Sequence, residues 1–200
     1  AVTDYASSGV YLTQSNVTAK SADLTVKVKI DNRAMQPEKI SIRTSIYEKD
    51  GAVKWSMTSP VALQSQGREV VSQTMKIKKP HLWQGLDDPY LYKTVVQLLK
   101  NEKVIDEVVQ PLGFRSFELK TADGMYLNGK KVPMYGVCRH QDWWELGSAL
   151  SNKNHDTDLE IIKEIGATTI RLAHYQQSDY FYSKCDSIGL MVWAEIPFVN

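Results

Sequence analysis

Residues 136–143 read GVCRHQDW, and they follow the largely apolar run VPMY at 132–135. An arginine, a histidine, an aspartate and a tryptophan fall within the last five of these positions. A strand that only filled a core would not end in this way, because a buried polar group costs free energy unless it is paired. The stretch therefore predicts a strand over 131–140 whose carboxyl end presents polar side chains to a functional site.

Downstream of this strand the sequence alternates between helix and strand signals. We expect a helix over 155–166, a strand over 167–175, a second helix over 178–189 and a third strand over 190–198. Strands that alternate with short helices indicate parallel βαβ units with right-handed crossovers. Three strands and two helices cannot close a barrel, so we expect the chain to be a piece of a longer protein. The alternative is a small complete α/β domain, whose open parallel edge would be unusual.

Both expected helices have recognisable ends. In the first helix, Thr157 and Glu160 have the spacing of a capping box, and Leu159, Ile162 and Ile165 form one apolar stripe. We expect Gly166 to end the first helix. We expect Ser178 to cap the start of the second helix and Gly189 to end it.

Before residue 118 the signals are those of strands. The stretch 23–30, DLTVKVKI, alternates apolar and polar residues, and 39–51 repeats the pattern before a hairpin turn at Asp50–Gly51. The apolar faces comprise Leu24, Val26, Val28 and Ile30 in the first stretch and Ile40, Ile42 and Ile46 in the second. We expect seven or eight short strands in a β-sandwich and no helix in this half.

Composition narrows the class of protein. Hydrophobic residues make up 42% and charged residues 24% of the 200, which fits a globular protein. A net charge of +1 gives no indication of nucleic acid or an anionic membrane as partner. The N-terminus, AVTDYASSG, lacks the features of a signal peptide. The two cysteines, Cys138 and Cys185, do not suggest a disulfide framework, and we expect both to be buried thiols.

Polar side chains fall at the end of each strand in the second half. Arg139, His140 and Asp142 end the first strand, Arg171, His174 and Tyr175 lie at the end of the second, and Glu195 ends the third. In parallel α/β folds the active site lies at the carboxyl ends of the strands. We therefore expect these groups to share one rim.

Structural interpretations remain open for the individual residues. A lone histidine at a strand end is more often structural than functional, Arg171 could be a buried ion-pair partner, and Glu195 could cap a helix. Trp143 and Trp144 favour loop packing over a sugar platform. His140, His174 and Glu195 are zinc-compatible residue types, but the spacing of known zinc motifs is absent, so we expect no metal site.

Three blocks of sequence resemble glycoside hydrolase family 2, which includes β-galactosidases, β-glucuronidases and β-mannosidases. They are PHLWQGLDDPYLYKTVVQL at 80–98, GFRSFELKTADGMYLNGKKVPMYGVCRHQD at 113–142 and IRLAHYQQSDYFYSKCDSIGLMVWAEIP at 170–197. The resemblance implies an immunoglobulin-like β-sandwich over residues 1–118 and the first βα units of a truncated TIM (β/α)8 barrel over 119–200. Within the first block, Trp83 looks like a structural anchor.

The resemblance also implies roles for the strand-end residues. His140, His174 and Asp142 are expected to bind the sugar, and Arg171 to orient the nucleophile. Arg139 and Glu195 are expected behind these residues or at the rim of the site. The two catalytic glutamates of the family would lie beyond residue 200. Many relatives have asparagine where this chain has Cys138, so a hydrogen bond from that position would be lost.

The expected function is that of a retaining hydrolase of terminal β-D-galactosides, with the chain itself inactive. The alternatives are β-glucuronidase, β-mannosidase or a non-catalytic carbohydrate-binding or assembly module. No cofactor is expected in this chain, whereas magnesium is open for the full-length enzyme. β-Galactosides are the expected partners, and a homo-oligomeric full-length enzyme is compatible with the family. Location in cytoplasm or periplasm stays undecided.

Overall fold

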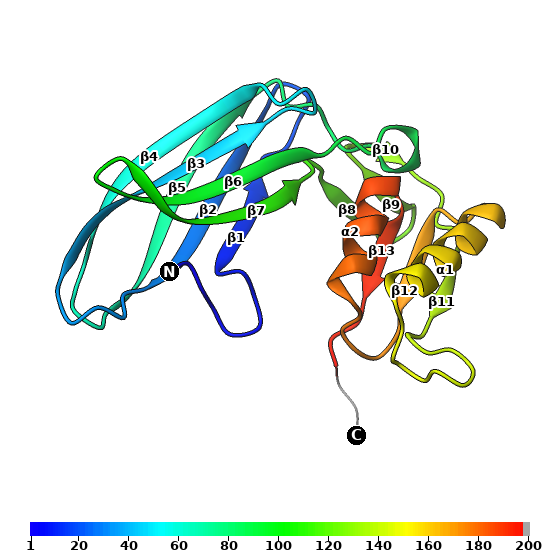
Figure 1. Ribbon diagram of the computed structural model, residues 1–200. Coiled ribbons are helices and arrows are strands. Elements are labelled where there is room, and N and C mark those ends of the chain that lie inside the picture. The colour runs from blue at the N-terminus through cyan, green and yellow to red at the C-terminus, as the bar shows by residue number, and fades with distance from the viewer. Residues whose placement is uncertain (198–200) are drawn as a thin grey trace. The chain divides into compact units, whose positions relative to one another are not determined.

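The computed structural model describes residues 1–197 and divides the chain into two compact units (Figure 1). Unit 1 comprises residues 1–81 and 91–114. Unit 2 comprises residues 82–90 and the chain from 115 onward. The sequence places a boundary near 118 but gives no sign that 82–90 leaves the first unit and belongs to the second.

Unit 1 is a sandwich of antiparallel strands. One sheet has the order β1-β2-β5 and the other β4-β3-β6-β7. These seven strands agree with the number expected from the sequence. Their bounds are Val10–Ser15 (β1), Ser21–Asp31 (β2), Glu38–Tyr47 (β3), Val53–Leu63 (β4), Arg68–Lys78 (β5), Tyr92–Lys100 (β6) and Lys103–Leu112 (β7).

The predicted apolar faces form the core of unit 1. Each of the seven residues named above is at most 7% exposed. Gln73 of β5 is buried among them, and its amide joins the two sheets. Its Oε1 accepts a hydrogen bond from Thr44 Oγ1 at 2.5 Å, and its Nε2 donates to Ile42 O at 3.1 Å. The buried amide is thus paired on both sides, which offsets its loss of hydration.

The predicted hairpin turn joins β3 to β4. Gly51 has φ +88°, a left-handed conformation that favours glycine, and its N–H donates to Glu48 O at 3.0 Å. The Asp50 carboxylate accepts a hydrogen bond from Ala52 N at 2.9 Å. The Asp-Gly dipeptide therefore acts here as the sequence predicts.

Unit 2 contains a parallel sheet in the order β11-β12-β13, and a small antiparallel sheet in the order β10-β9-β8. The parallel βαβ arrangement predicted from the sequence is confirmed. The bounds are Gly85–Asp87 (η1, a 3-10 turn), Phe117–Lys120 (β8), Gly124–Leu127 (β9), Lys130–Lys131 (β10), Gly136–Arg139 (β11), Asn152–Glu164 (α1), Thr169–Leu172 (β12), Asp179–Ile188 (α2) and Met191–Ala194 (β13).

The single strand expected over 131–140 is wrong. The chain pairs briefly in β10, leaves the sheet, and pairs again in β11. Pro133 lies in the gap and has no N–H to donate to a ladder. β11 begins at Gly136, where a Cβ would stand 2.3 Å from Thr169 O of the neighbouring strand. Of the expected third strand, 190–198, only Met191–Ala194 forms a strand (β13); residues 195–197 are described but are not part of it, and Phe198 lies outside the described residues.

The expected start of α1 is also wrong. The helix begins one turn earlier, with Ser151 as N-cap, and Ser151 N donates to Asn154 Oδ1 at 2.9 Å. Thr157 instead bonds back to Lys153 O within the helix at 3.0 Å. Ile165 is 60% exposed because the helix ends at Glu164 and Ile165 has left the helical conformation.

The remaining helix expectations hold. Gly166 follows α1 with φ +75°, Ser178 is the N-cap of α2, and Gly189 ends α2 with φ +84°. Leu159 and Ile162 of α1 pack with Ile170, Leu172, Phe181, Cys185 and Leu190 in one buried cluster. The two helices and β12 therefore share a core.

Trp83 anchors the segment 82–90 within unit 2. Its ring is 1% exposed, and its Nε1 donates to Asp186 O of α2 at 2.7 Å. Asn128 Nδ2 donates to Trp83 O at 2.8 Å, and the Arg115 guanidinium lies 4.7 Å from the ring centroid. These contacts agree with the anchoring role predicted for Trp83.

Candidate functional site

The carboxyl ends of the three parallel strands lie at one level. Arg139 of β11 pairs in register with Leu172 of β12, which pairs with Ala194 of β13. His140, His174 and Glu195 follow these positions within two residues along the chain. The register therefore brings the predicted residues to a common edge.

Two histidines meet at this edge. The ring centroids of His140 and His174 are 5.2 Å apart with an interplanar angle of 52°, and both side chains are exposed. The Tyr175 ring lies 6.5 Å from His140, and Tyr175 Oη accepts a hydrogen bond from Gln141 N at 2.8 Å. Two imidazoles thus face solvent side by side.

Glu195 joins the ends of β12 and β13. Its Oε2 accepts a hydrogen bond from His174 N at 2.6 Å, and its Oε1 accepts from Arg171 Nε at 2.8 Å. These donors, the His174 N–H first, lower the pKa of Glu195 below its usual range, although burial opposes them. Glu195 is therefore held as a carboxylate, and within the described residues it caps no helix.

Cys138 lies in the same row of the sheet as Arg171 and Trp193. Arg171 Nη1 donates to Cys138 Sγ at 3.3 Å. Cys138 is exposed, contrary to our expectation, because alternate residues of a strand face opposite sides and the helices cover the side of Val137. Cys185 is buried as expected, and burial raises the pKa of its thiol to about 12.

Arg139 does not lie at an exposed rim. It is 6% exposed, and both its Nε and Nη2 donate to Asp158 Oδ2, at 2.8 and 2.6 Å. Nη2 also lies 2.8 Å from His155 Nδ1, and Nη1 donates to Gln177 Oε1. Arg139 therefore ties the end of β11 to α1 and to the start of α2.

Asp142 follows in an exposed position beside a shallow hollow of β11 and α1 that Trp143 and Asp158 also line. Trp143 Nε1 donates to Asp158 Oδ1 of α1 at 2.9 Å, so this side chain joins the loop after β11 to the helix. Trp144, in contrast, is 91% exposed.

Sequence reasoning missed the residues around Arg139. Asp158, His155 and Gln177 carry no motif that marks them, and Asp158 is one of several acidic residues near the start of α1. A buried arginine needs an acceptor, which is the only sequence-level signal that could have directed attention to Asp158.

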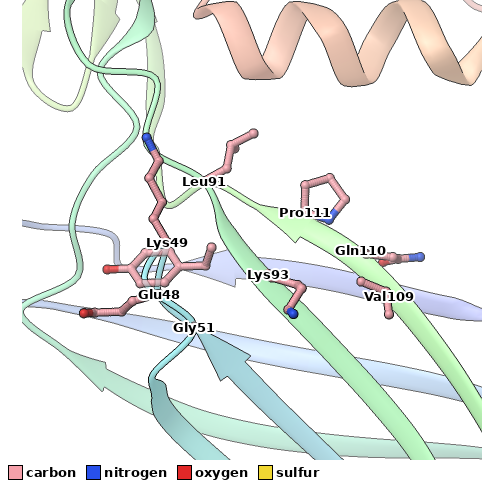
Figure 2. A pocket seen from close by; sticks show the side chains of 9 residues that line it. Glu48, Lys49, Gly51, Leu91, Lys93, Val109, Gln110 and Pro111 are labelled. Carbon is pink, nitrogen blue, oxygen red and sulfur yellow. The ribbon is translucent and has the colours of Figure 1, made fainter.

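Unit 1 has a surface hollow of its own, lined by Glu48, Lys49, Leu91, Lys93 and Pro111 among others (Figure 2). The aromatic lining residue Tyr92 is 2% exposed and packs edge-on against Trp55 and Phe114. A buried ring cannot serve as a stacking face for a sugar. This hollow contains none of the candidate site residues.

Neither a metal cluster nor a membrane span is found in the part of the chain that the structure describes. Across residues 1–197, no group of three or more His, Cys, Asp or Glu side chains is arranged to hold a metal ion. No helix in that range has the length and apolar character needed to cross a membrane.

Comparison with known proteins gives concordant results. The model described as "Glycosyl hydrolases family 2" matches residues 8–115, and the model described as "Glycosyl hydrolases family 2, TIM barrel domain" matches residues 117–200. The chain is 41% identical over 198 residues to a β-glucuronidase of Bacteroides fragilis, covering 98% of the chain. It is 32% identical over 188 residues to a β-galactosidase of Bacteroides ovatus, covering 94%.

A solved structure is also similar to this chain in fold and in sequence. A Bacteroides fragilis protein that carries the provisional name β-galactosidase superposes with a TM-score of 0.96 at 55% identity over 100% of the chain. The chain spans 28% and 22% of the two curated relatives and 30% of this solved chain. Because the two family models match nearly all of the sequence in the order of its sandwich and its parallel βαβ units, the chain belongs to glycosyl hydrolase family 2 and comprises an immunoglobulin-like domain followed by the start of a TIM barrel.

Proposed function

We propose that these residues belong to a longer retaining β-glycosidase and form one wall of its sugar subsite. The observation that carries the proposal is the meeting of His140 and His174 at the carboxyl ends of adjacent parallel strands, with ring centroids 5.2 Å apart. Active sites of TIM barrels lie at this end of the strands.

The chemistry follows from the donors at this edge. Retaining hydrolysis uses two carboxyl groups ~5–5.5 Å apart and passes through an oxocarbenium-like state. Imidazoles that donate hydrogen bonds to sugar hydroxyls stabilise that state when the bonds strengthen as the ring distorts. Arg171, as a fixed cation, would keep the nucleophile ionised. Asp142 would contribute a further acceptor for hydroxyl groups.

We propose a β-galactoside as substrate. A glucuronide adds a carboxylate to the sugar and requires a cation or amide to receive it. Arg139 is buried and paired with Asp158, and Arg171, already paired with Glu195, is the cation proposed to serve the nucleophile, so neither is left for a sugar carboxylate. A β-glucuronide is the second candidate, because a relative 41% identical to the chain is named a β-glucuronidase. Its carboxylate would be received by residues outside 1–197.

The test is hydrolysis of nitrophenyl β-glycosides by the full-length protein that contains this chain. Preferential cleavage of the galactoside supports the proposal, and replacing His140 or His174 by Ala should then lower kcat/KM by about 10²-fold or more. Preferential cleavage of the glucuronide would transfer the proposal to the second candidate. Cleavage of no glycoside would refute a hydrolytic function.

The 200-residue chain alone should be inactive, because the resemblance places the acid/base and the nucleophile outside it. This expectation would be overturned by a hydrolytic activity toward an aryl β-galactoside, if that activity co-purifies with the chain and is lost in the His174→Ala variant.

A further inference from the structure

The backbone of His174 adopts an unusual conformation. Its φ is +66°, in the left-handed region that residues other than glycine seldom adopt. The residue follows β12 by two positions and carries one of the two exposed imidazoles. Such a conformation persists only when surrounding contacts hold it, and it is often found at functional sites.

One side chain supplies these contacts. Glu195 Oε2 lies 2.6 Å from His174 N and 3.5 Å from His174 Nδ1. The other oxygen, Oε1, accepts from Arg171 Nε at 2.8 Å and lies 2.5 Å from Arg171 Nη2. A single carboxylate thus holds the backbone of one site residue and the side chain of another.

The backbone of Glu195 is itself fixed. Glu195 N donates to Leu172 O at 3.3 Å, which extends the pairing of β13 with β12 by one residue. The Glu195 side chain is 25% exposed, so its bonds are partly shielded from water. The backbone that carries the Glu195 carboxylate therefore has a defined position at the end of the sheet.

We propose that Glu195 is a positioning residue for the glycoside hydrolysis proposed above. It holds His174 in the left-handed conformation and locks Arg171 by the same carboxylate, so that the His174 imidazole stays beside His140. This inference rests on the proposed function for its catalytic consequence, whereas its structural part stands on the contacts of Glu195 alone.

A carboxylate is required at this position. Both of its oxygens accept hydrogen bonds, whereas glutamine offers one acceptor and one donor group. In Glu195→Gln the NH₂ group must face either His174 N–H or Arg171, both of which are donors. We call the bonds from the Glu195 carboxylate to His174 N and to Arg171 the clamp. The variant keeps the size of the side chain and loses one of these two bonds.

The kinetic test uses the full-length protein. Glu195→Gln should lower kcat/KM by about tenfold to about 100-fold, the scale expected when a site group is misplaced by about 1 Å. Combined with His174→Ala, it should lower kcat/KM by less than the product of the two single effects, because the clamp then has one residue fewer to position. Multiplicative losses would refute the positioning role. Glu160→Gln, at an exposed position of α1, is the matched control and should change kcat/KM by less than about twofold.

The structural test does not depend on activity. In the 200-residue chain labelled with [¹⁵N]histidine, four amide signals are expected, and His174→Gly identifies that of His174. The His174 amide should exchange slowly with solvent in the wild type and at least about tenfold faster in Glu195→Ala, because this variant lacks both carboxylate oxygens and leaves the His174 N–H without its acceptor. Unchanged exchange would refute the clamp.

The other histidine amides report whether the variant is folded, His155 being buried. If Glu195→Ala unfolds the chain, Glu195→Asp replaces it, and exchange at His174 should still be faster than in the wild type because the shorter side chain cannot reach the same position. If the wild-type enzyme cleaves no glycoside, the proposed function fails, while the exchange experiment still decides whether Glu195 holds His174.

Discussion

At the scale of single residues, Arg139 is a buried charged side chain that needs an ionic partner. Its buried guanidinium meets Asp158, whose side chain is 18% exposed, and a positive charge at this depth would be costly without that partner. The Arg139 guanidinium also lies 4.0 Å from the Phe181 ring centroid. The network therefore couples charge pairing to packing between β11, α1 and α2.

We predict that Arg139→Met lowers the free energy of unfolding of unit 2 by about 3–5 kcal/mol, because Asp158 is left shielded from water without its cation. Urea unfolding followed by circular dichroism measures the change. Arg33→Met is the control: this exposed arginine pairs with Asp31, and its loss should cost less than about 1 kcal/mol. Similar losses in both variants would contradict the prediction.

His155 makes the same network sensitive to pH. Burial, followed by the nearby Arg139 charge, lowers the pKa of His155 below its usual 6.5. The unfolded state then takes up the proton at higher pH than the folded state does. The stability contribution of neutral His155 is therefore present above about pH 6.5 and is lost as the pH falls below it.

We predict that the unfolding free energy of unit 2 decreases between about pH 7 and pH 5, and that His155→Gln reduces this dependence. Glutamine can accept the Arg139 hydrogen bond but does not titrate in this range. Urea unfolding at several pH values gives both slopes. An identical slope in the variant would assign the pH dependence to other groups.

At the scale of elements, the start of α1 is set by Ser151. We predict that Ser151→Ala destabilises unit 2 by about 1 kcal/mol, the usual cost of losing a serine N-cap. Thr157→Ala removes only a bond within the helix and replaces threonine by a better helix former, so its effect should be close to zero. Thermal or urea unfolding of the two variants separates them, and the reverse ranking would restore Thr157 as the cap.

The end of α2 depends on Gly189 for two reasons. Its φ is +84°, and a Cβ would stand 2.2 Å from Gly85 O. We predict that Gly189→Ala lowers the unfolding free energy by about 3 kcal/mol or more, since backbone strain and a clash with main chain act together.

Gly166 provides the matched control for Gly189. It has φ +75° but open space around the Cβ position, so Gly166→Ala should lower the unfolding free energy by only about 1–2 kcal/mol. Urea unfolding of both variants measures the difference. Equal losses would show that the approach of η1 to α2 contributes nothing to the requirement at Gly189.

At the scale of the whole molecule, the two units differ in how well the described strands and helices within each unit bury their apolar side chains. In unit 1 the inward faces of the central strands β2, β3 and β6 are buried, and those of β4 and β7 are mostly half-buried. In unit 2 the parallel sheet has only three strands, and large apolar side chains around it are exposed, namely Trp193 at 53%, Ile161 at 54% and Ile196 at 87%. Fewer buried contacts make local opening easier.

We predict that amides of the parallel sheet in unit 2 exchange with solvent faster than those of the sandwich in unit 1. Hydrogen exchange of the 200-residue chain, analysed by mass spectrometry of its peptides, measures both. The comparison is made on a sample shown to be monomeric, because self-association would cover the open faces. Equally slow exchange in both units would contradict the prediction.

Features that depend only on neighbouring residues could be predicted from the amino-acid sequence. Alternation placed Leu24, Val26, Val28 and Ile30 on a buried face, and the helix–strand order after residue 118 indicated parallel pairing. Polar residues could be recognised at the end of each predicted strand. They were expected to lie together because parallel strands end at the same edge of a sheet. These signals have the period of the element itself, so they can be read along the chain without knowledge of its fold.

Which distant groups meet became apparent only from the folded chain. It brought Asp158 and Gln177 to Arg139, joined Glu195 to His174, and returned the Trp83 segment to unit 2. It also left Cys138 exposed, although a largely apolar stretch precedes it in the sequence. Such pairings join residues far apart along the chain, whereas the periodicity of a sequence indicates only which face of a single strand or helix is buried.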